Sequence, residues 1–296
     1  MRRLSLLLLL FTFVSFGQTP QRPAITGVAF FRMYAADPAT SASFYSKTLG
    51  LPGKESAGVT RYTVNSSQWL EVKPLPSPAP VSRMEAVAFT TRDVAALERY
   101  LKAHSVAIVQ PLKDGSFGVH DPEGNLILFL QQGVKPAGLP APSPDAPSHR
   151  IIHAGFMVAD RANEDAFWQG ILGFRPYWYG GPKPDAINWV SLQVPDGSDW
   201  IEYMLNNPPN PTLQHIGVMD HFSLGVVNMK DTVAKLAANH CEGPNCTKSQ
   251  MGKDGKVQLN LYDPDLTRVE FMEFQPSEKP CCSEFTGKHP SETEDQ

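Results

Sequence analysis

The sequence predicts an α+β protein of two tandem domains, each built from two βαβββ modules that curl into an open, barrel-like sheet around a cavity. Three observations predict this class: a proline-rich stretch divides the chain, the segments on its two sides repeat one another, and each segment alternates strand-like and helix-like patterns. We expect domains at 24–132 and 149–275, an extended linker at 133–148, and a polar, disordered tail at 276–296.

The repeat shows in residues that keep their order on both sides of the linker. The distance between equivalent residues rises slowly, from 123 positions near the start of the repeat to 142 near its end. Such a drift indicates one pattern whose second copy has longer loops. The equivalent pairs are Asp37 and Asp160, Phe44 and Phe167, Glu71 and Glu202, Met84 and Met219, and Asp121 and Asp263.

Local patterns give the order of elements within each domain. In the second domain, IIHAGFMVAD alternates as a strand does, RANEDAFWQGIL has helical spacing that ends at Gly173, and NWVSLQVP and SDWIEYML are strand-like. The cycle restarts with the strand DHFSLGVV, the helix MKDTVAKLAAN, and the strands VQLNLYD and TRVEFMEF. The first domain follows with GVAFFRMY, TSASFYSKTL, SQWLEVK, MEAVAFTT, DVAALERYLKAH and NLILFLQ, and one short strand per module is only weakly visible.

Residues 1–17 predict a secretory signal peptide. Arg2 and Arg3 precede an apolar run that is short for a membrane-spanning helix, and small residues surround the expected cleavage site near Gly17. We therefore expect an exported protein, periplasmic or secreted, with no membrane association after cleavage, as a monomer or homodimer. The net charge of −4, without any block of Lys or Arg, disfavours nucleic acid as a partner.

Four cysteines in an exported chain permit disulfides. Cys241 and Cys246 lie in a loop-like segment, where they could close a small ring. Cys281 and Cys282 are adjacent, so a bridge between them would be strained, and the pairing stays open at this point.

Four residues of the second domain predict its chemistry. His153 and Glu202 are 49 positions apart, His221 and Glu270 are also 49 apart, and one shift of 68 superimposes the first pair on the second. Two copies of a His–Glu unit indicate a duplicated module that supplies two ligands per copy to one metal. Imidazole and carboxylate ligands suit zinc, nickel, cobalt, manganese or iron. A small same-face neighbour, Gly155, leaves room for a bound group.

A paired βαβββ unit with a His on its first strand and a Glu on its last resembles the vicinal oxygen chelate (VOC) superfamily, which includes glyoxalase I, methylmalonyl-CoA epimerase, bleomycin-resistance proteins and extradiol dioxygenases. The resemblance rests on IIHAGFMV, DWIEYML, MDHFSLGV and DPDLTRVEFMEF and covers nearly all of the mature chain. It implies that His153, Glu202, His221 and Glu270 hold a divalent metal ion that chelates adjacent oxygens of a small-molecule substrate. It also implies that Glu202 or Glu270 loosens from the metal and acts as the catalytic general base.

The resemblance leaves three functions open. A lyase or isomerase of the glyoxalase or epimerase type comes first, because all four ligands are present. The alternative is an extradiol-type ring-cleavage dioxygenase with Fe(II), although Asn260 and Leu266 stand where those enzymes carry Tyr and Gly, and His215 is poorly placed to be their extra catalytic His. The third is a non-catalytic small-molecule binding (resistance) protein, although such proteins generally lack the metal ligands.

The first domain departs from the ligand pattern. Phe30, Glu71, Ala86 and Leu128 stand at the four equivalent positions, so we expect no metal there and read Glu71 as a surface or loop-pairing carboxylate.

Other polar and aromatic residues receive ordinary structural interpretations. We expect His104 and His120 to face solvent. We expect four strand-spaced aromatic residues to belong to the core more than to a cavity lining, and they are Trp178, Tyr179, Trp189 and Trp200.

Overall fold

The computed structural model describes residues 21–293, so the predicted signal peptide lies outside the described residues. The strands of the first domain are β1 (Ile25–Ala35), β2 (Gly53–Ser56), β3 (Val59–Thr63), β4 (Trp69–Pro74), β5 (Met84–Thr91), β6 (Ile108–Lys113), β7 (Ser116–His120) and β8 (Leu126–Gln131). Those of the second domain are β9 (Ile151–Met157), β10 (Arg175–Gly180), β11 (Trp189–Gln193), β12 (Trp200–Met204), β13 (His221–Val226), β14 (Ser249–Met251), β15 (Val257–Tyr262) and β16 (Arg268–Glu273).

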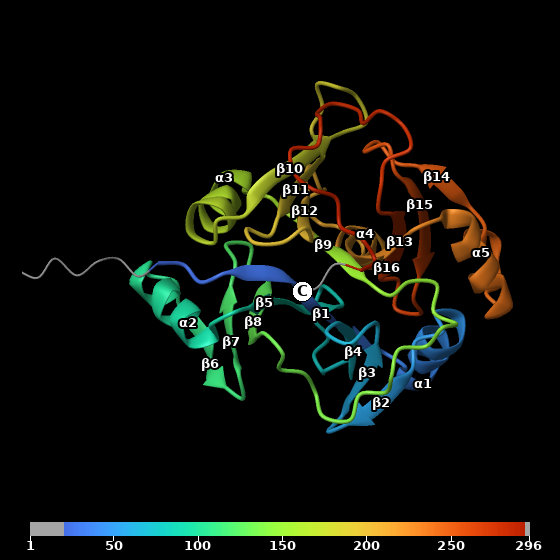
Figure 1. Cartoon of the computed structure of the whole chain (residues 1–296), viewed down its shortest axis with the longest axis horizontal. Helices are drawn as coiled ribbons and strands as arrows, with labels where there is room; N and C mark the ends of the chain where they lie inside the picture. The colour runs from blue at the N-terminus through green and yellow to red at the C-terminus, as the bar shows by residue number, and fades with distance from the viewer. Residues whose placement is uncertain (1–20, 294–296) are drawn as a thin grey trace, which may run out of the picture.

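Each domain forms one eight-stranded mixed sheet (Figure 1). The strand order is β2-β3-β4-β1-β5-β8-β7-β6 in the first domain and β10-β11-β12-β9-β13-β16-β15-β14 in the second. The two orders are the same when the strands of each domain are counted from its start. Within a sheet, the first strands of the two modules pair antiparallel at the centre, and each module's last strand pairs parallel with its first. The predicted α+β class and the duplicated βαβββ modules are therefore confirmed.

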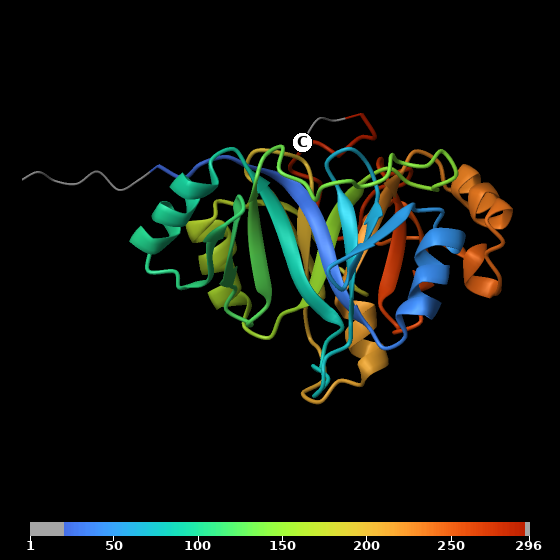
Figure 2. The same ribbon diagram turned by 90° about the horizontal axis from the view of Figure 1, so that it is seen from below.

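Four helices lie at the two ends of the sheets, α2 and α3 at one end and α1 and α5 at the other, whereas α4 lies near the middle of the second sheet beside β9 and β16 (Figures 1 and 2). The helices are α1 (Pro38–Ser43), α2 (Val94–Ala103), α3 (Arg161–Asp165), α4 (Leu213–Met219) and α5 (Met229–Ala238), with π-helical segments η1 (Phe44–Thr48) and η2 (Ala166–Ile171) and a 3₁₀ turn η3 (Pro244–Cys246). Asp37 and Asp160, one of the repeated pairs, accept hydrogen bonds from backbone N–H groups at the starts of α1 and α3. The sequence patterns did not predict α4, which directly precedes β13.

The largest apolar cluster is continuous across the two domains, because it contains buried residues of both sheets and of the helices. Gln68 links the domains at the centre: its side-chain amide donates to the carbonyls of Val28 on β1 and Ile151 on β9, and its oxygen accepts from the Ile151 N–H. Val28 N–H also donates to Asp199 of the second domain. The opposite face of each sheet holds a separate, smaller cluster, and the candidate site lies on that face in the second domain.

The C-terminal tail packs against the second domain, contrary to the disorder that its polar composition predicted. The Phe285 ring lies 4.8 Å from that of Tyr177, and the imidazole of His289 hydrogen-bonds the Tyr177 hydroxyl. The carbonyl of Lys288 accepts a hydrogen bond from the Gln193 side chain. A few apolar and hydrogen-bonding residues therefore hold a segment whose average composition is that of a solvated tail.

Both disulfides join cysteines that are close in sequence. Cys241 pairs with Cys246, which closes the small ring that the sequence allowed. Cys281 pairs with its neighbour Cys282, although we expected strain to disfavour this bridge. Within residues 21–293, no helix combines the length and the apolar character that crossing a bilayer requires.

Candidate metal centre

One row of site residues crosses β9, β13 and β16. His153 pairs with Ser223, and Ser223 pairs with Glu270, which places the imidazole and the carboxylate two strands apart on one face of the sheet. A register shift separates Ile151 from His153. This irregularity is a β-bulge, in which one extra residue interrupts the alternation of side chains between the two faces of the strand. Ile152 and His153, although adjacent, therefore both contribute to the face of the sheet that carries the site.

The next row crosses β12, β9 and β13 and contains Glu202, Gly155 and His221. The His221 ring lies directly over Gly155: a Cβ added to Gly155 would come within 2.1 Å of the imidazole Cε1. A glycine is therefore needed at this position for His221 to reach the centre of the site. The room that the sequence predicted beside the ligands is thus filled by one of the ligands themselves.

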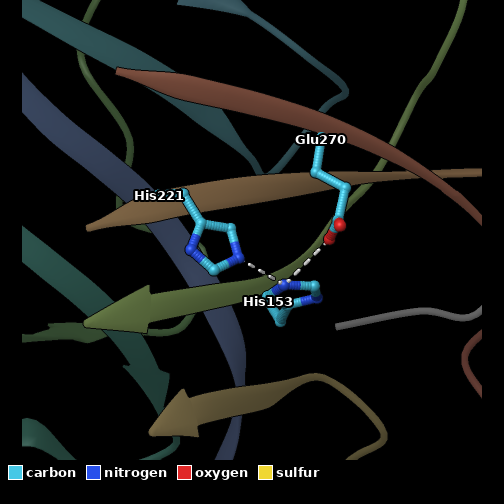
Figure 3. Close-up of side chains that lie close together, drawn as sticks. All are labelled: His153, His221 and Glu270. Carbon is cyan, nitrogen blue, oxygen red and sulfur yellow. Dashed lines mark hydrogen bonds and ion pairs between the residues drawn. The ribbon is translucent and has the colours of Figure 1, made fainter. Parts of the chain in front are cut away.

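Three predicted ligands meet at one point, as Figure 3 shows. Nε2 of His153 lies 3.1 Å from Nε2 of His221 and 3.3 Å from Oε2 of Glu270. One nitrogen from each imidazole and one carboxylate oxygen all lie within 4.8 Å of one another, and the three side chains are buried. Nδ1 of His221 bonds the Met219 carbonyl at 2.8 Å, so it carries the hydrogen and directs the Nε2 lone pair at the centre.

The protonation of these groups suits a bound cation. Burial lowers the pKa of His153, and burial together with the Arg268 guanidinium lowers the pKa of His221 well below its usual value. Burial alone would raise the pKa of Glu270, but Arg268 and His153 outweigh it and lower this pKa to about 2. Two neutral imidazoles and one carboxylate therefore face each other.

The residues fit a divalent metal ion. Oε2 of Glu270 is buried and has no hydrogen-bond partner within the described part of the chain. A cation between the three donor atoms would neutralise the carboxylate and use both facing nitrogens, and two imidazoles with one carboxylate are a common ligand set for zinc and for non-haem iron.

Glu202, the fourth predicted ligand, lies beside this group and not within it. Its Oε2 is 3.7 Å from Nε2 of His221, and its side chain is 13% exposed, against 3% for Glu270. Burial, with the nearby Glu270 carboxylate as the second cause, raises the pKa of Glu202 to about 8. The two glutamates that the sequence treated as equivalent thus differ in position and in acidity.

A pocket of about 280 Å³ opens next to the three ligands. It is lined by two carboxylates of the site and by polar, basic and apolar side chains of β10 to β16, which are Trp178, Trp189, Glu202, Met204, Gln250, Met251, Gly252, Lys253, Asp254, Gln258, Arg268 and Glu270. Trp178 is buried in the apolar cluster of this face, as expected, and also borders the pocket; Trp189 packs against that cluster and borders the pocket too, and the expectation was wrong for the exposed Tyr179. Trp200 is buried and lies against the His153 ring at 4.7 Å, whereas Tyr179 is 42% exposed.

Arg268 is a further residue of the site, which the sequence patterns did not indicate. Its Nη2 lies 2.7 Å from Nε2 of His221, and its Nη1 lies 3.8 Å from Oε1 of Glu270. A signal was present, because Arg268 is two residues before Glu270 on one strand and so shares its face.

A protein-family model matches the chain twice, over residues 27–129 and 150–271, and its description is the Glyoxalase/Bleomycin resistance protein/Dioxygenase superfamily. The chain belongs to this superfamily. The two matches coincide with the two sheets, so both domains carry the superfamily fold, in agreement with the resemblance seen in the sequence.

Solved structures similar to this one include dioxygenases. A variant of homoprotocatechuate 2,3-dioxygenase from B. fuscum aligns with a TM-score of 0.66 at 18% identity, over 92% of this chain and 76% of that chain. The same enzyme from Brevibacterium fuscum with 3,4-dihydroxyphenylacetate aligns with a TM-score of 0.63 at 18% identity, over 91% of this chain and 84% of that chain. The enzyme from Arthrobacter globiformis aligns with a TM-score of 0.63 at 20% identity, over 90% of this chain and 87% of that chain. These likenesses establish the fold, and a sequence search among curated proteins finds no match.

The first domain keeps the superfamily fold but has replaced the site. Strand register places Phe30, Glu71, Ala86 and Leu128 where the second domain has His153, Glu202, His221 and Glu270, as the repeat predicted. An apolar cluster that includes Phe30, Ala86 and Leu128 fills this face.

Glu71 is not the surface carboxylate that we expected, because it is only 2% exposed. It accepts from Arg32 at 2.6 Å, from Arg61 at 2.8 Å and from the Trp69 indole at 2.9 Å. Arg32 occupies the position of Gly155, so a guanidinium neutralises the remaining carboxylate.

Two histidines outside the site have different surroundings. His120 is exposed, as predicted. His104 is half-buried, contrary to prediction, and its Nδ1 lies 2.8 Å from the Tyr100 carbonyl.

Proposed function

We propose that this protein is a metal-dependent lyase or isomerase that moves a proton on a small substrate with two adjacent oxygens. The observation that carries the proposal is the position of Glu202. It lies beside the three ligands without belonging to their group, and it lines the same pocket. A carboxylate that is not held by the metal and faces the substrate pocket is suited to be a general base.

In this proposal the residues divide into two groups. His153, His221 and Glu270 would hold the cation, which when bound supplies Lewis-acid polarisation of the substrate oxygens. Glu202 would take a proton from a carbon that carries or adjoins those oxygens and return it to that carbon or, where the substrate allows, to the neighbouring one. The Arg268 guanidinium would face the negative charge that develops on the substrate.

Ring cleavage by an Fe(II) dioxygenase is the second candidate. It is favoured by the two-histidine, one-carboxylate ligand group, which is typical of non-haem iron oxygenases, and by the fold of the dioxygenases that align with the chain. Against it, Asn260 holds the position at which the resemblance led us to look for a Tyr.

We propose further that the enzyme acts outside the cytoplasm. The support is the N-terminal signal-like segment together with two disulfides, since disulfides persist mainly in oxidising compartments. N-terminal sequencing of the protein recovered from a secreting host tests this, and an intact Met1 in the cytoplasmic fraction would contradict it.

Proton exchange tests the proposed chemistry without knowledge of the natural substrate. Zinc- or cobalt-loaded protein is incubated in D₂O with a panel of α-hydroxy ketones and 2-hydroxy acids, and loss of the α-proton signal is followed by NMR. We expect metal-dependent exchange in the wild type, and at least a 100-fold decrease in Glu202→Gln, a typical effect of removing a general base.

The control separates binding from proton transfer. Glu202→Gln should keep its metal, because Glu202 lies outside the three-ligand group, whereas Glu270→Gln should lose it. Exchange that persists unchanged in Glu202→Gln would refute the role of this residue. Oxygen uptake by the Fe(II)-loaded protein with catechols, without proton exchange on any compound, would favour ring cleavage.

A further inference from the structure

Arg268 is the basic side chain closest to the three ligands. Its guanidinium nitrogens lie 2.7 Å from His221 and 3.8 Å from Glu270, and it also lines the pocket. The side chain is 13% exposed, and within residues 21–293 the Nη1 atom has only the long ion pair with Glu270. A guanidinium offers five N–H donors, so the part of this one that lines the pocket retains capacity for an acceptor that enters from it.

The charged side chains around the pocket would not fully neutralise the positive charge of a bound divalent metal ion. Three carboxylates lie in or beside the pocket, and three basic side chains accompany them. These are Glu202, Asp254 and Glu270, and Lys253, Lys256 and Arg268. Even with all three carboxylates ionised, they only match the three basic side chains, so a divalent cation would leave the site with excess positive charge, and an anionic substrate would neutralise it.

The remaining walls restrict the body of the substrate. Trp178, Trp189, Met204 and Met251 supply the apolar part of the lining. A volume of about 280 Å³ is below the range of roughly 300–1,000 Å³ that is usual for drug-sized ligands, so the substrate is small.

From this arrangement we propose that the substrate is a small carboxylate with an oxygen on the neighbouring carbon, a 2-hydroxy or 2-oxo acid, and that Arg268 selects it by binding the carboxylate. A planar guanidinium matches the planar carboxylate with two parallel hydrogen bonds. The carboxylate and the neighbouring oxygen together provide the two adjacent oxygens that the proposed function requires. This inference rests on that proposed function and adds the charge and the chemical class of the substrate.

A matched pair of ligands tests the role of Arg268 by binding alone. Mandelate and mandelamide share an aromatic body and a hydroxyl group next to the carbonyl carbon, and differ in charge. Their affinities for zinc-loaded protein are measured by titration calorimetry. We expect the wild type to prefer mandelate at least tenfold, and Arg268→Met to lose this preference while mandelamide binding changes less than threefold. Arg92→Met, a substitution at an exposed arginine of the first domain, is the control and should retain the preference.

A second variant and a metal count make each outcome decisive. Arg268→Lys keeps the positive charge without the paired donors, so it should bind mandelate at least threefold more weakly than the wild type, even if Arg268→Met does not fold. One zinc per chain with equal affinities for both ligands in the wild type would overturn this inference alone. Absence of bound zinc from the folded wild type would overturn the proposed function, and this inference with it.

Discussion

Replacement of Gly155 by alanine should remove metal binding without unfolding the protein. The added Cβ would lie 2.1 Å from Cε1, 2.5 Å from Nδ1 and 3.0 Å from Nε2 of the His221 ring. Carbon atoms in contact are about 3.5 Å apart, so the ring has to move by about 1.5 Å. Metal–ligand distances tolerate only about 0.2 Å. His221 therefore ceases to be a ligand in this variant, although it is still present.

The magnitudes of the two effects differ. Crowding in a well-packed region costs typically about 1–3 kcal/mol. Gly155 lies in the strand β9, where alanine is itself favoured over glycine by about 0.5–1 kcal/mol, so we expect a net loss of stability of about 1–2 kcal/mol. Even removal of a group that only supports a metal ligand weakens binding by about 10–100-fold. Displacement of a ligand should reach at least the upper end of that range.

The assay compares zinc affinity, measured by competition with a chromogenic chelator, with the free energy of urea unfolding of the metal-free protein. Gly225→Ala is the matched control. Its Cβ would lie 2.3 Å from the Phe274 ring and 2.6 Å from Ile152, so it causes similar crowding on the neighbouring strand without contact to a ligand. We expect both variants to lose comparable stability and only Gly155→Ala to lose zinc. Zinc affinity within threefold of wild type in Gly155→Ala would refute the reasoning.

Two further predictions concern stability. Burial alone would raise the pKa of Glu71, but Arg32, Trp69 and Arg61 outweigh it and lower this pKa. The Glu71→Gln substitution should therefore decrease the free energy of urea unfolding by about 3 kcal/mol and leave zinc affinity unchanged. A decrease of less than about 1 kcal/mol would contradict this prediction. Burial, with the Asp121 carboxylate, raises the pKa of Glu164 from 4.5 to about 8, so the folded state holds this proton more tightly than the unfolded state. The contribution of Glu164 is then complete below pH 4.5 and is lost as the pH rises to about 8, and the difference in unfolding free energy between wild type and Glu164→Gln should shift against the wild type over this range. A difference that is the same at pH 5 and pH 8 would exclude this linkage.

The sequence predicted the parts of the fold that repeat. A duplicated module explains why Asp37 and Asp160 cap equivalent helices and why the two His–Glu spacings are equal. Because equivalent strands pair in a fixed register, residues with this spacing lie close together in the sheet. His153, His221 and Glu270 could be predicted as neighbours because each stands at the same place in its module.

The contacts made between distant segments could not be predicted in this way. Glu71 has the same sequence signature as Glu202, but its surroundings depend on Arg32, which is 39 positions away and sits where the second domain has a glycine. The difference in position between Glu202 and Glu270 is also tertiary, since the side chains of β9, β13 and β16 meet at one point and that of Glu202 on β12 stays beside them. Packing of the tail depends on single residues such as Phe285, which a composition average hides.

The central claim is that two modules of the second domain bring their first-strand histidines and one last-strand glutamate to a single divalent cation. Anomalous scattering from crystals grown with zinc, recorded on both sides of its absorption edge, tests this most directly. We predict one strong peak per chain in the second domain, about 2.0–2.2 Å from Nε2 of His153, Nε2 of His221 and a carboxylate oxygen of Glu270. A peak bound by other side chains, or no peak above the edge in the fully folded protein, would contradict the account.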